Sequence, residues 1–149
     1  MSFDSYRRRL PHLRSAGATY FVTWRLEPGQ AELTPDERSV VANALPYFDG
    51  RRYELLAYVV MNDHVHVLVS PLGATRLQDV LHSWKSYTAN QLQSAFGRFG
   101  RIWQEEYFDR IVRDDAELLE KTTYILNNAR KRWPEVGHYQ WVWVRGEQE

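Results

Sequence analysis

Two histidines separated by a single residue, His64 and His66, lie inside the apolar segment 58–69. In an extended strand alternate side chains point to the same face, so both imidazoles would emerge on one side and Val65 on the other. Two neutral imidazoles about 7 Å apart along a strand can share one metal ion. The pair is therefore a candidate metal site. The alternative is two partly buried histidines that hydrogen-bond to neighbouring residues.

A tyrosine and an asparagine four residues apart, Tyr124 and Asn128, occupy a second candidate segment. This spacing puts both side chains on one face of a helix. If the helix packs near the histidines, Asn128 would offer its side-chain carbonyl as a third ligand, and the Tyr124 phenol would be a nucleophile one turn away. Such a site would attack a phosphate. The alternative is a tyrosine packed on the core with its hydroxyl at the rim, and an asparagine on the surface.

The composition limits which metal such a site would take. The 149 residues are 44% hydrophobic and include no cysteine, which predicts one folded domain, 1–149, and excludes disulfides, thiolate zinc sites and a cysteine nucleophile. Nitrogen and oxygen ligands favour Mg²⁺ or Mn²⁺ over a structural zinc.

The charged residues balance overall but are unevenly distributed. With 19 basic and 19 acidic residues the net charge is zero, so bulk electrostatics do not predict binding to a polyanion. Basic clusters can still contact phosphates locally, and a solvated basic surface is the alternative. The candidate DNA contacts are Arg7, Arg8, Arg9 and Arg14 in or near a basic arm (1–17), Lys85, Arg110, and Arg130, Lys131 and Arg132.

The sequence shows no targeting or membrane segment. Its start has no apolar core of signal-peptide length. No run approaches the ~18 apolar residues that a membrane helix needs. We therefore expect a cytoplasmic protein that makes no membrane contact.

Local patterns predict the elements that would position these residues. Thr34 and Glu37 form a capping box, which predicts a helix start, and Asn62-Asp63 is a tight turn that joins two strands as a hairpin. The expected strands are 18–26, 53–62, 64–70 and 103–112, the expected helices are 34–48, 77–96 and 116–132, and 138–144 is a short strand or ordered part of the tail 134–149.

This order of elements predicts an α+β fold of the ferredoxin-like, split β-α-β type. We expect an antiparallel sheet with its helices on one face. The strand that carries His64 and His66 would be central, so that both side chains project from the other face.

Four segments of the chain together resemble the REP-associated tyrosine transposases, an IS200-like branch of the single-tyrosine HUH transposase superfamily. The match runs from about residue 10 to 133 in matching order. The segments are Pro11-His-Leu with Tyr20-Phe-Val-Thr; Ala57-Tyr-Val-Val-Met-Asn-Asp-His-Val-His-Val-Leu-Val69; Trp84-Lys-Ser-Tyr-Thr88 with Ile102-Trp-Gln-Glu-Glu-Tyr-Phe-Asp-Arg110; and Tyr124-Ile-Leu-Asn-Asn128.

The resemblance implies a site and a substrate. His64, His66 and Asn128 would hold a divalent metal, and Tyr124 would cut single-stranded DNA that carries a hairpin, leaving a 5′-phosphotyrosine and a free 3′-hydroxyl. Such proteins act as monomers or homodimers. The chain departs from the family at Ala129, where the family usually has a proline. The sequence therefore does not fix the residue at which the last helix ends.

Two other hypotheses are compatible with the sequence. One is a catalytically inactive protein that keeps the fold to bind hairpin or single-stranded DNA. The other is a metal-binding domain without a role in nucleic-acid chemistry.

Overall fold

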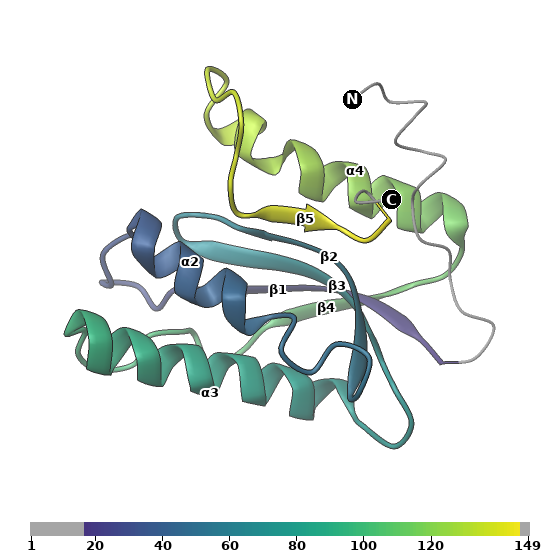
Figure 1. Ribbon diagram of the computed structural model, residues 1–149, viewed down its shortest axis with the longest axis horizontal. Coiled ribbons are helices and arrows are strands. Elements are labelled where there is room, and N and C mark those ends of the chain that lie inside the picture. Colours follow the sequence, from purple (N-terminus) through teal and green to yellow (C-terminus); the bar gives the residue numbers. More distant parts are fainter. Residues whose placement is uncertain (1–16, 147–149) are drawn as a thin grey trace.

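The computed structural model describes residues 17–146, so the candidate contacts Arg7, Arg8, Arg9 and Arg14 lie outside the described residues. The fold is α+β, as predicted, and is built on a five-stranded antiparallel sheet of order β4-β1-β3-β2-β5 (Figure 1). Among the described residues, no helix has both the length and the apolar character needed to cross a membrane.

The predicted elements are present, with changes at their ends. Trp103 makes only an isolated bridge to Leu26, so the strand expected from residue 103 begins at Phe108. The helix with the capping box of Thr34 and Glu37 ends earlier than expected. The elements are β1 (Thr19–Arg25), α2 (Pro35–Ala44), β2 (Tyr53–Val60), β3 (His64–Pro71), α3 (Leu77–Phe96), β4 (Phe108–Val112), α4 (Asp115–Arg132) and β5 (Val142–Val144).

The histidine strand, β3, is central, as expected from the split β-α-β order. It pairs with β1 on one side and with β2 on the other, both antiparallel. Its buried valines Val65, Val67 and Val69 belong to a core cluster with residues of α2 and α3. Leu68, on the histidine side of the strand, belongs to a different cluster with residues of α4. The predicted alternation of β3 is confirmed.

The expectation that the helices share one face is wrong for α4. Figure 1 shows α2 and α3 on one side of the sheet and α4 on the other. The reason is apolar burial: Leu118 and Ile125 of α4 are fully buried in one cluster with Phe21 and Leu68 of the sheet. Without α4 this part of the histidine face would leave apolar side chains in water.

A buried arginine ties α3 to the segment before α2. Its guanidinium, which has five N–H donors, makes five hydrogen bonds of 2.6–3.1 Å: two to the Glu37 carboxylate and one each to Gln30, Ala31 and Glu32. This residue, Arg98, follows the glycine that ends α3. All its donors are therefore satisfied in a site with little water.

The same segment supports the turn that leads to the histidines. The amide of Leu33 donates to the Asn62 carbonyl at 2.7 Å, and the amide of Leu26 donates to the Asp63 carbonyl at 2.9 Å. The pair of Arg98 and Glu37 thus stabilises the backbone on which the turn before His64 rests.

A second clamp joins α3 to the chain before β4. The ammonium of Lys85 donates to the carbonyls of Gln104 and Glu105, both at 2.8 Å. The indole N–H of Trp103 donates to the Thr88 hydroxyl, one turn from Lys85 on α3, at 2.9 Å. These bonds explain why the motifs at 84–88 and 102–110 occur together: the helix holds the loop in place.

We predict that Glu37→Gln lowers the free energy of unfolding by about 3 kcal/mol at neutral pH, because it leaves a buried guanidinium without its counter-charge. Hydrogen bonding to Arg98 lowers the pKa of Glu37 below 4.5. As the pH falls, the Glu37 carboxylate is therefore protonated at a higher pH in the unfolded chain than in the folded protein. The stabilisation is complete above the unfolded pKa and is lost as the pH falls through the folded pKa.

Urea unfolding at pH 7 and at lower pH measures both effects. The exposed Glu32→Gln is the control and should change stability by less than about 0.5 kcal/mol. Equal stability of Glu37→Gln and the wild type at pH 7 would contradict the prediction.

We predict that Lys85→Met loosens residues 104–107, because two carbonyls lose a charged donor while the apolar stem is kept. Hydrogen–deuterium exchange should become faster in this segment, and stability should fall by about 1–2 kcal/mol. His82→Met, an exposed change on the same helix, should leave exchange in the loop unchanged. Unaltered exchange in Lys85→Met would show that the clamp is not needed.

Candidate functional site

His66 lies in the middle of the sheet, buried, with one ring nitrogen occupied and the other free. Its Nδ1 is 2.7 Å from the hydroxyl oxygen of Thr23, its cross-strand partner on β1. Its Nε2 is buried and has no hydrogen-bond partner among residues 17–146. A buried polar atom without a partner calls for an explanation, and a ligand that binds there would supply it.

His64 lies beside His66, with a ring-centroid separation of 4.7 Å. Its Nδ1 is 2.7 Å from a carboxylate oxygen of Asp63, in the turn between β2 and β3. In both histidines the Nδ1 is engaged, so the Nε2 atoms are left as the candidate metal ligands. The spacing of the pair predicts that both imidazoles lie on one face of β3, and their rings are adjacent there. The contact with Asp63 comes from the turn before the strand and was not predicted.

Burial keeps His66 neutral. Desolvation is the largest cause that lowers the pKa of His66, and together with the electrostatic effects of His64, Arg25 and Lys121 it brings the pKa to about 3. A neutral imidazole is the form that binds metal.

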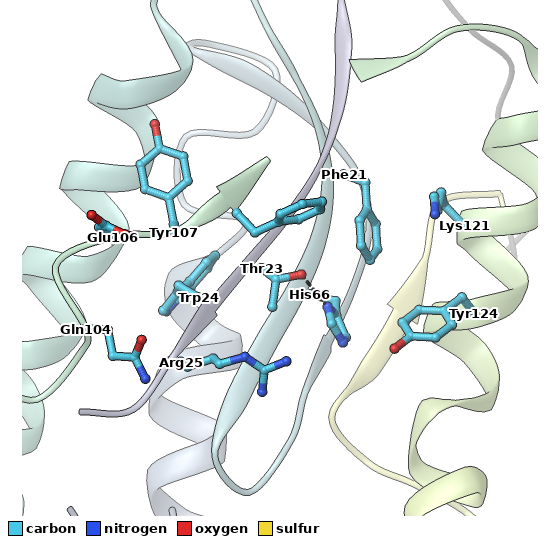
Figure 2. A pocket seen from close by; sticks show the side chains of 11 residues that line it. Phe21, Thr23, Trp24, Arg25, His66, Gln104, Glu106, Tyr107, Lys121 and Tyr124 are labelled. Atoms are coloured by element: carbon cyan, nitrogen blue, oxygen red, sulfur yellow. Dashed lines mark hydrogen bonds between the residues drawn. The ribbon is translucent and has the colours of Figure 1, made fainter. Parts of the chain in front are cut away.

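Tyr124 projects from α4 onto the histidine face. Its ring centroid is 5.3 Å from that of His66 and 6.0 Å from that of Phe21. The side chain is 43% exposed, and Figure 2 shows its phenol group pointing toward His66. The structure therefore brings together a histidine and a tyrosine that are 58 residues apart in the sequence. This makes the phenol available to a substrate at the histidines.

Asn128 is buried on α4, one turn beyond Tyr124. Helix α4 runs along the strands. Lys121 lies over the ring of Phe21, which pairs with Leu68. Tyr124, three residues later, lies beside His66, which is two residues from Leu68 on β3. Four helical residues advance about 6 Å and two strand residues about 7 Å, so a helix that continued on this course would bring Asn128 level with His64. Its role as a third ligand stays a prediction that this course supports.

A metal ion at the two histidines would need an amide or another neutral oxygen as a further ligand. Within residues 17–146, no group of three or more His, Asp or Glu side chains could hold a metal ion. Two imidazoles joined by the Asn128 carbonyl and by substrate or water oxygens would suit Mg²⁺ or Mn²⁺.

A pocket of about 660 Å³ opens beside these residues, between β1, the segment before β4 and α4 (Figure 2). Two cations line it, Arg25 and Lys121, which the sequence analysis missed. Arg25 stands opposite His64 in the β1–β3 register, and Lys121 lies one turn before Tyr124. The other lining residues are Phe21, Thr23, Trp24, His66, Gln104, Glu106, Tyr107, Phe108 and Tyr124.

A signal for Lys121 was present in its spacing from Tyr124 on a predicted helix. Arg25 had no such signal, because its position depends on strand register. The pocket wall that holds Gln104 is the loop that Lys85 clamps.

The predicted DNA-contacting cations have different surroundings. Lys85 holds the loop carbonyls, and Arg110 pairs with Glu117 at 3.2 Å. Lys131 lies 5.8 Å over the Tyr124 ring, which places it at the site. Arg132 lies over the ring of Trp133, and Arg130 is exposed in the same last turn of α4.

Comparisons with known proteins identify a family for a large part of the chain. The family model described as "Transposase IS200 like" matches residues 36–128, more than half of the chain. Among curated proteins, none matches.

Two solved structures are similar in fold. The REP-associated tyrosine transposase bound to a REP hairpin is 21% identical, with a TM-score of 0.68 over 89% of this chain and 82% of that chain. A candidate transposase from Deinococcus radiodurans is 20% identical, with a TM-score of 0.56 over 79% and 97%. The match to the family model, over a range that includes both histidines, the tyrosine and the asparagine, shows that the chain belongs to the family of IS200-like transposases.

Proposed function

We propose that this protein is a metal-dependent endonuclease and strand transferase that cuts single-stranded DNA through a covalent bond to Tyr124. The observation that carries the proposal is the Tyr124 ring 5.3 Å from that of His66, whose buried Nε2 has no partner in the part of the chain that the structure describes. A nucleophile, a free ligand atom and a cationic pocket meet there. A structural tyrosine would need no such neighbours.

The residues divide the work by their chemistry. His64, His66 and Asn128 would hold Mg²⁺ or Mn²⁺, which when bound polarises a phosphate oxygen and stabilises the charge that develops on it. The phenol of Tyr124 gives up its proton and its oxygen attacks phosphorus. A P–O bond forms to Tyr124 while the bond to the 3′-oxygen breaks, and that oxygen leaves as a 3′-hydroxyl.

The products retain the energy of the cut bond. The 5′-phosphotyrosine can be attacked by a 3′-hydroxyl, which rejoins a strand and restores the phenol. No nucleotide cofactor is needed. This chemistry suits a strand transferase as well as an endonuclease.

Arg25 and Lys121 are the groups that would bind phosphates next to the cut. Both line the pocket, and Figure 2 shows them on either side of the pair formed by His66 and Tyr124. Lys131, above the Tyr124 ring, adds a third cation. Electrostatic contacts of this kind bind the DNA backbone without reading its sequence.

The substrate class is proposed from the pocket and from one relative. The similar transposase is bound to a REP hairpin. In this chain Phe108 is 58% exposed and Tyr107 also lines the pocket, so both offer ring surfaces on which unpaired bases can stack. We propose single-stranded DNA with an adjacent hairpin as the substrate, bound by a monomer or a homodimer.

Incubation of the protein with Mn²⁺ and a labelled hairpin from the DNA that flanks its own gene tests the reaction. We predict a covalent protein–DNA adduct in the wild type and none in Tyr124→Phe, which keeps the ring but removes the attacking oxygen. Tyr87→Phe is the matched control, since Tyr87 is also exposed but lies on α3. A chelator should prevent the adduct.

The outcomes separate the hypotheses. An adduct that persists in Tyr124→Phe would overturn the choice of nucleophile. Tight hairpin binding without an adduct in the wild type would favour an inactive DNA-binding protein. Failure to bind single-stranded DNA at low salt would leave only a metal-binding role.

We further predict that Arg25→Gln slows adduct formation by about ten- to a hundredfold, because the pocket loses a donor next to the reacting phosphate. Single-turnover rates at saturating protein measure this. Arg52→Gln changes the net charge equally, but Arg52 lies over the Phe48 ring and does not line the pocket, so this variant should react normally. Equal slowing in both variants would indicate a general charge effect.

A further inference from the structure

One hydrogen bond inside the sheet engages Nδ1 of His66 and leaves Nε2, which is buried, without a partner among the described residues. Thr23 and His66 are cross-strand partners on β1 and β3, and their side chains meet at 2.7 Å in a buried position. Figure 2 shows this bond as the link between the two side chains. The contact involves Nδ1, so Nε2 is the atom left over.

The rings around His66 cannot make this selection. Phe21 stacks on the imidazole at 5.3 Å and 21°, and Tyr124 meets it at 5.3 Å and 68°. Both contacts limit the tilt of the ring, but they do not distinguish one nitrogen from the other. Within residues 17–146, the hydrogen bond at the ring edge is the one to the Thr23 hydroxyl, so Thr23 is the group that distinguishes the two nitrogens.

We propose that Thr23 is a positioning residue that orients the His66 ring and, by accepting a hydrogen bond from Nδ1–H, favours the tautomer able to bind metal. When the Thr23 oxygen accepts a hydrogen bond from Nδ1–H, Nε2 carries a lone pair and can ligate. When the ring has the other tautomer, Nε2 carries a proton and cannot. The inference rests on the proposed metal site and deepens it by naming the group that prepares it.

The two histidines are thus oriented by different partners. His64 has the carboxylate of Asp63, which is half-exposed, whereas His66 has a neutral hydroxyl in the interior. A carboxylate at position 23 would be a buried negative charge close to a site for phosphate. A hydroxyl orients the ring without adding negative charge. This explains why a threonine, and not an acidic residue, suits the inner position.

Metal affinity in the absence of DNA tests the proposal on the full chain. Mn²⁺ binding, followed by electron paramagnetic resonance, should be about ten- to a hundredfold weaker in Thr23→Val, which is nearly isosteric but cannot accept a hydrogen bond. Thr23→Ser restores the hydroxyl and should bind within a few-fold of the wild type.

A matched control lies on the same strand and the same face. Thr19 and Ser70 form another buried hydroxyl pair between β1 and β3, at 3.4 Å, without a histidine. Thr19→Val should lose a similar amount of stability yet keep Mn²⁺ affinity. Wild-type affinity in Thr23→Val, or an equal loss in Thr19→Val, would overturn the role of Thr23.

A measurement on the unsubstituted protein keeps the test open if Thr23→Val does not fold. Nitrogen-15 shifts of the His66 ring report which nitrogen carries the proton. We expect it on Nδ1, and a proton on Nε2 would overturn the proposal. Wild-type protein with Nδ1 protonated that binds no Mn²⁺ would instead overturn the metal site itself, and with it the purpose assigned to Thr23.

Discussion

The structure depends on the two-sided burial of the central strand β3. Its valines pack against α2 and α3, and its other face carries His64, His66 and Leu68 beneath α4. An imidazole in such a place loses its water, and an unpaired polar group in the interior costs free energy. The Thr23 hydroxyl offsets part of that cost for Nδ1, and Nε2 is left unsatisfied. The fold thus leaves the Nε2 atom of His66 able to bind a ligand.

Helix α4 brings the other candidate residues to the histidine face of β3. Its apolar residues Leu118 and Ile125 anchor it to the sheet, and the same packing fixes where its other side chains fall. Tyr124 comes to His66, and Lys121 comes to Phe21. One helical turn and two strand residues cover about the same distance. Side chains one turn apart on α4 therefore lie near side chains two residues apart on the strands. Position on the helix therefore translates into position at the site.

The rest of the chain supports the site at a distance. The pair of Arg98 and Glu37 holds the segment on which the turn before His64 rests, and Lys85 holds the loop that forms the far wall of the pocket. These residues touch neither the histidines nor Tyr124. Their bonds are made within the protein, so they shape the pocket without contributing chemistry.

The sequence by itself determined the elements, the alternation of β3 and the helical spacing of Tyr124 and Asn128, because periodicity and capping at Thr34 are local properties. It also indicated the family, because the order of the motifs can be compared without coordinates. Only the tertiary structure decided that α4 lies on the histidine face, and that Arg25 and Thr23 stand opposite His64 and His66. These are matters of strand register and helix packing, which depend on contacts between residues far apart in the chain and leave no local pattern to read.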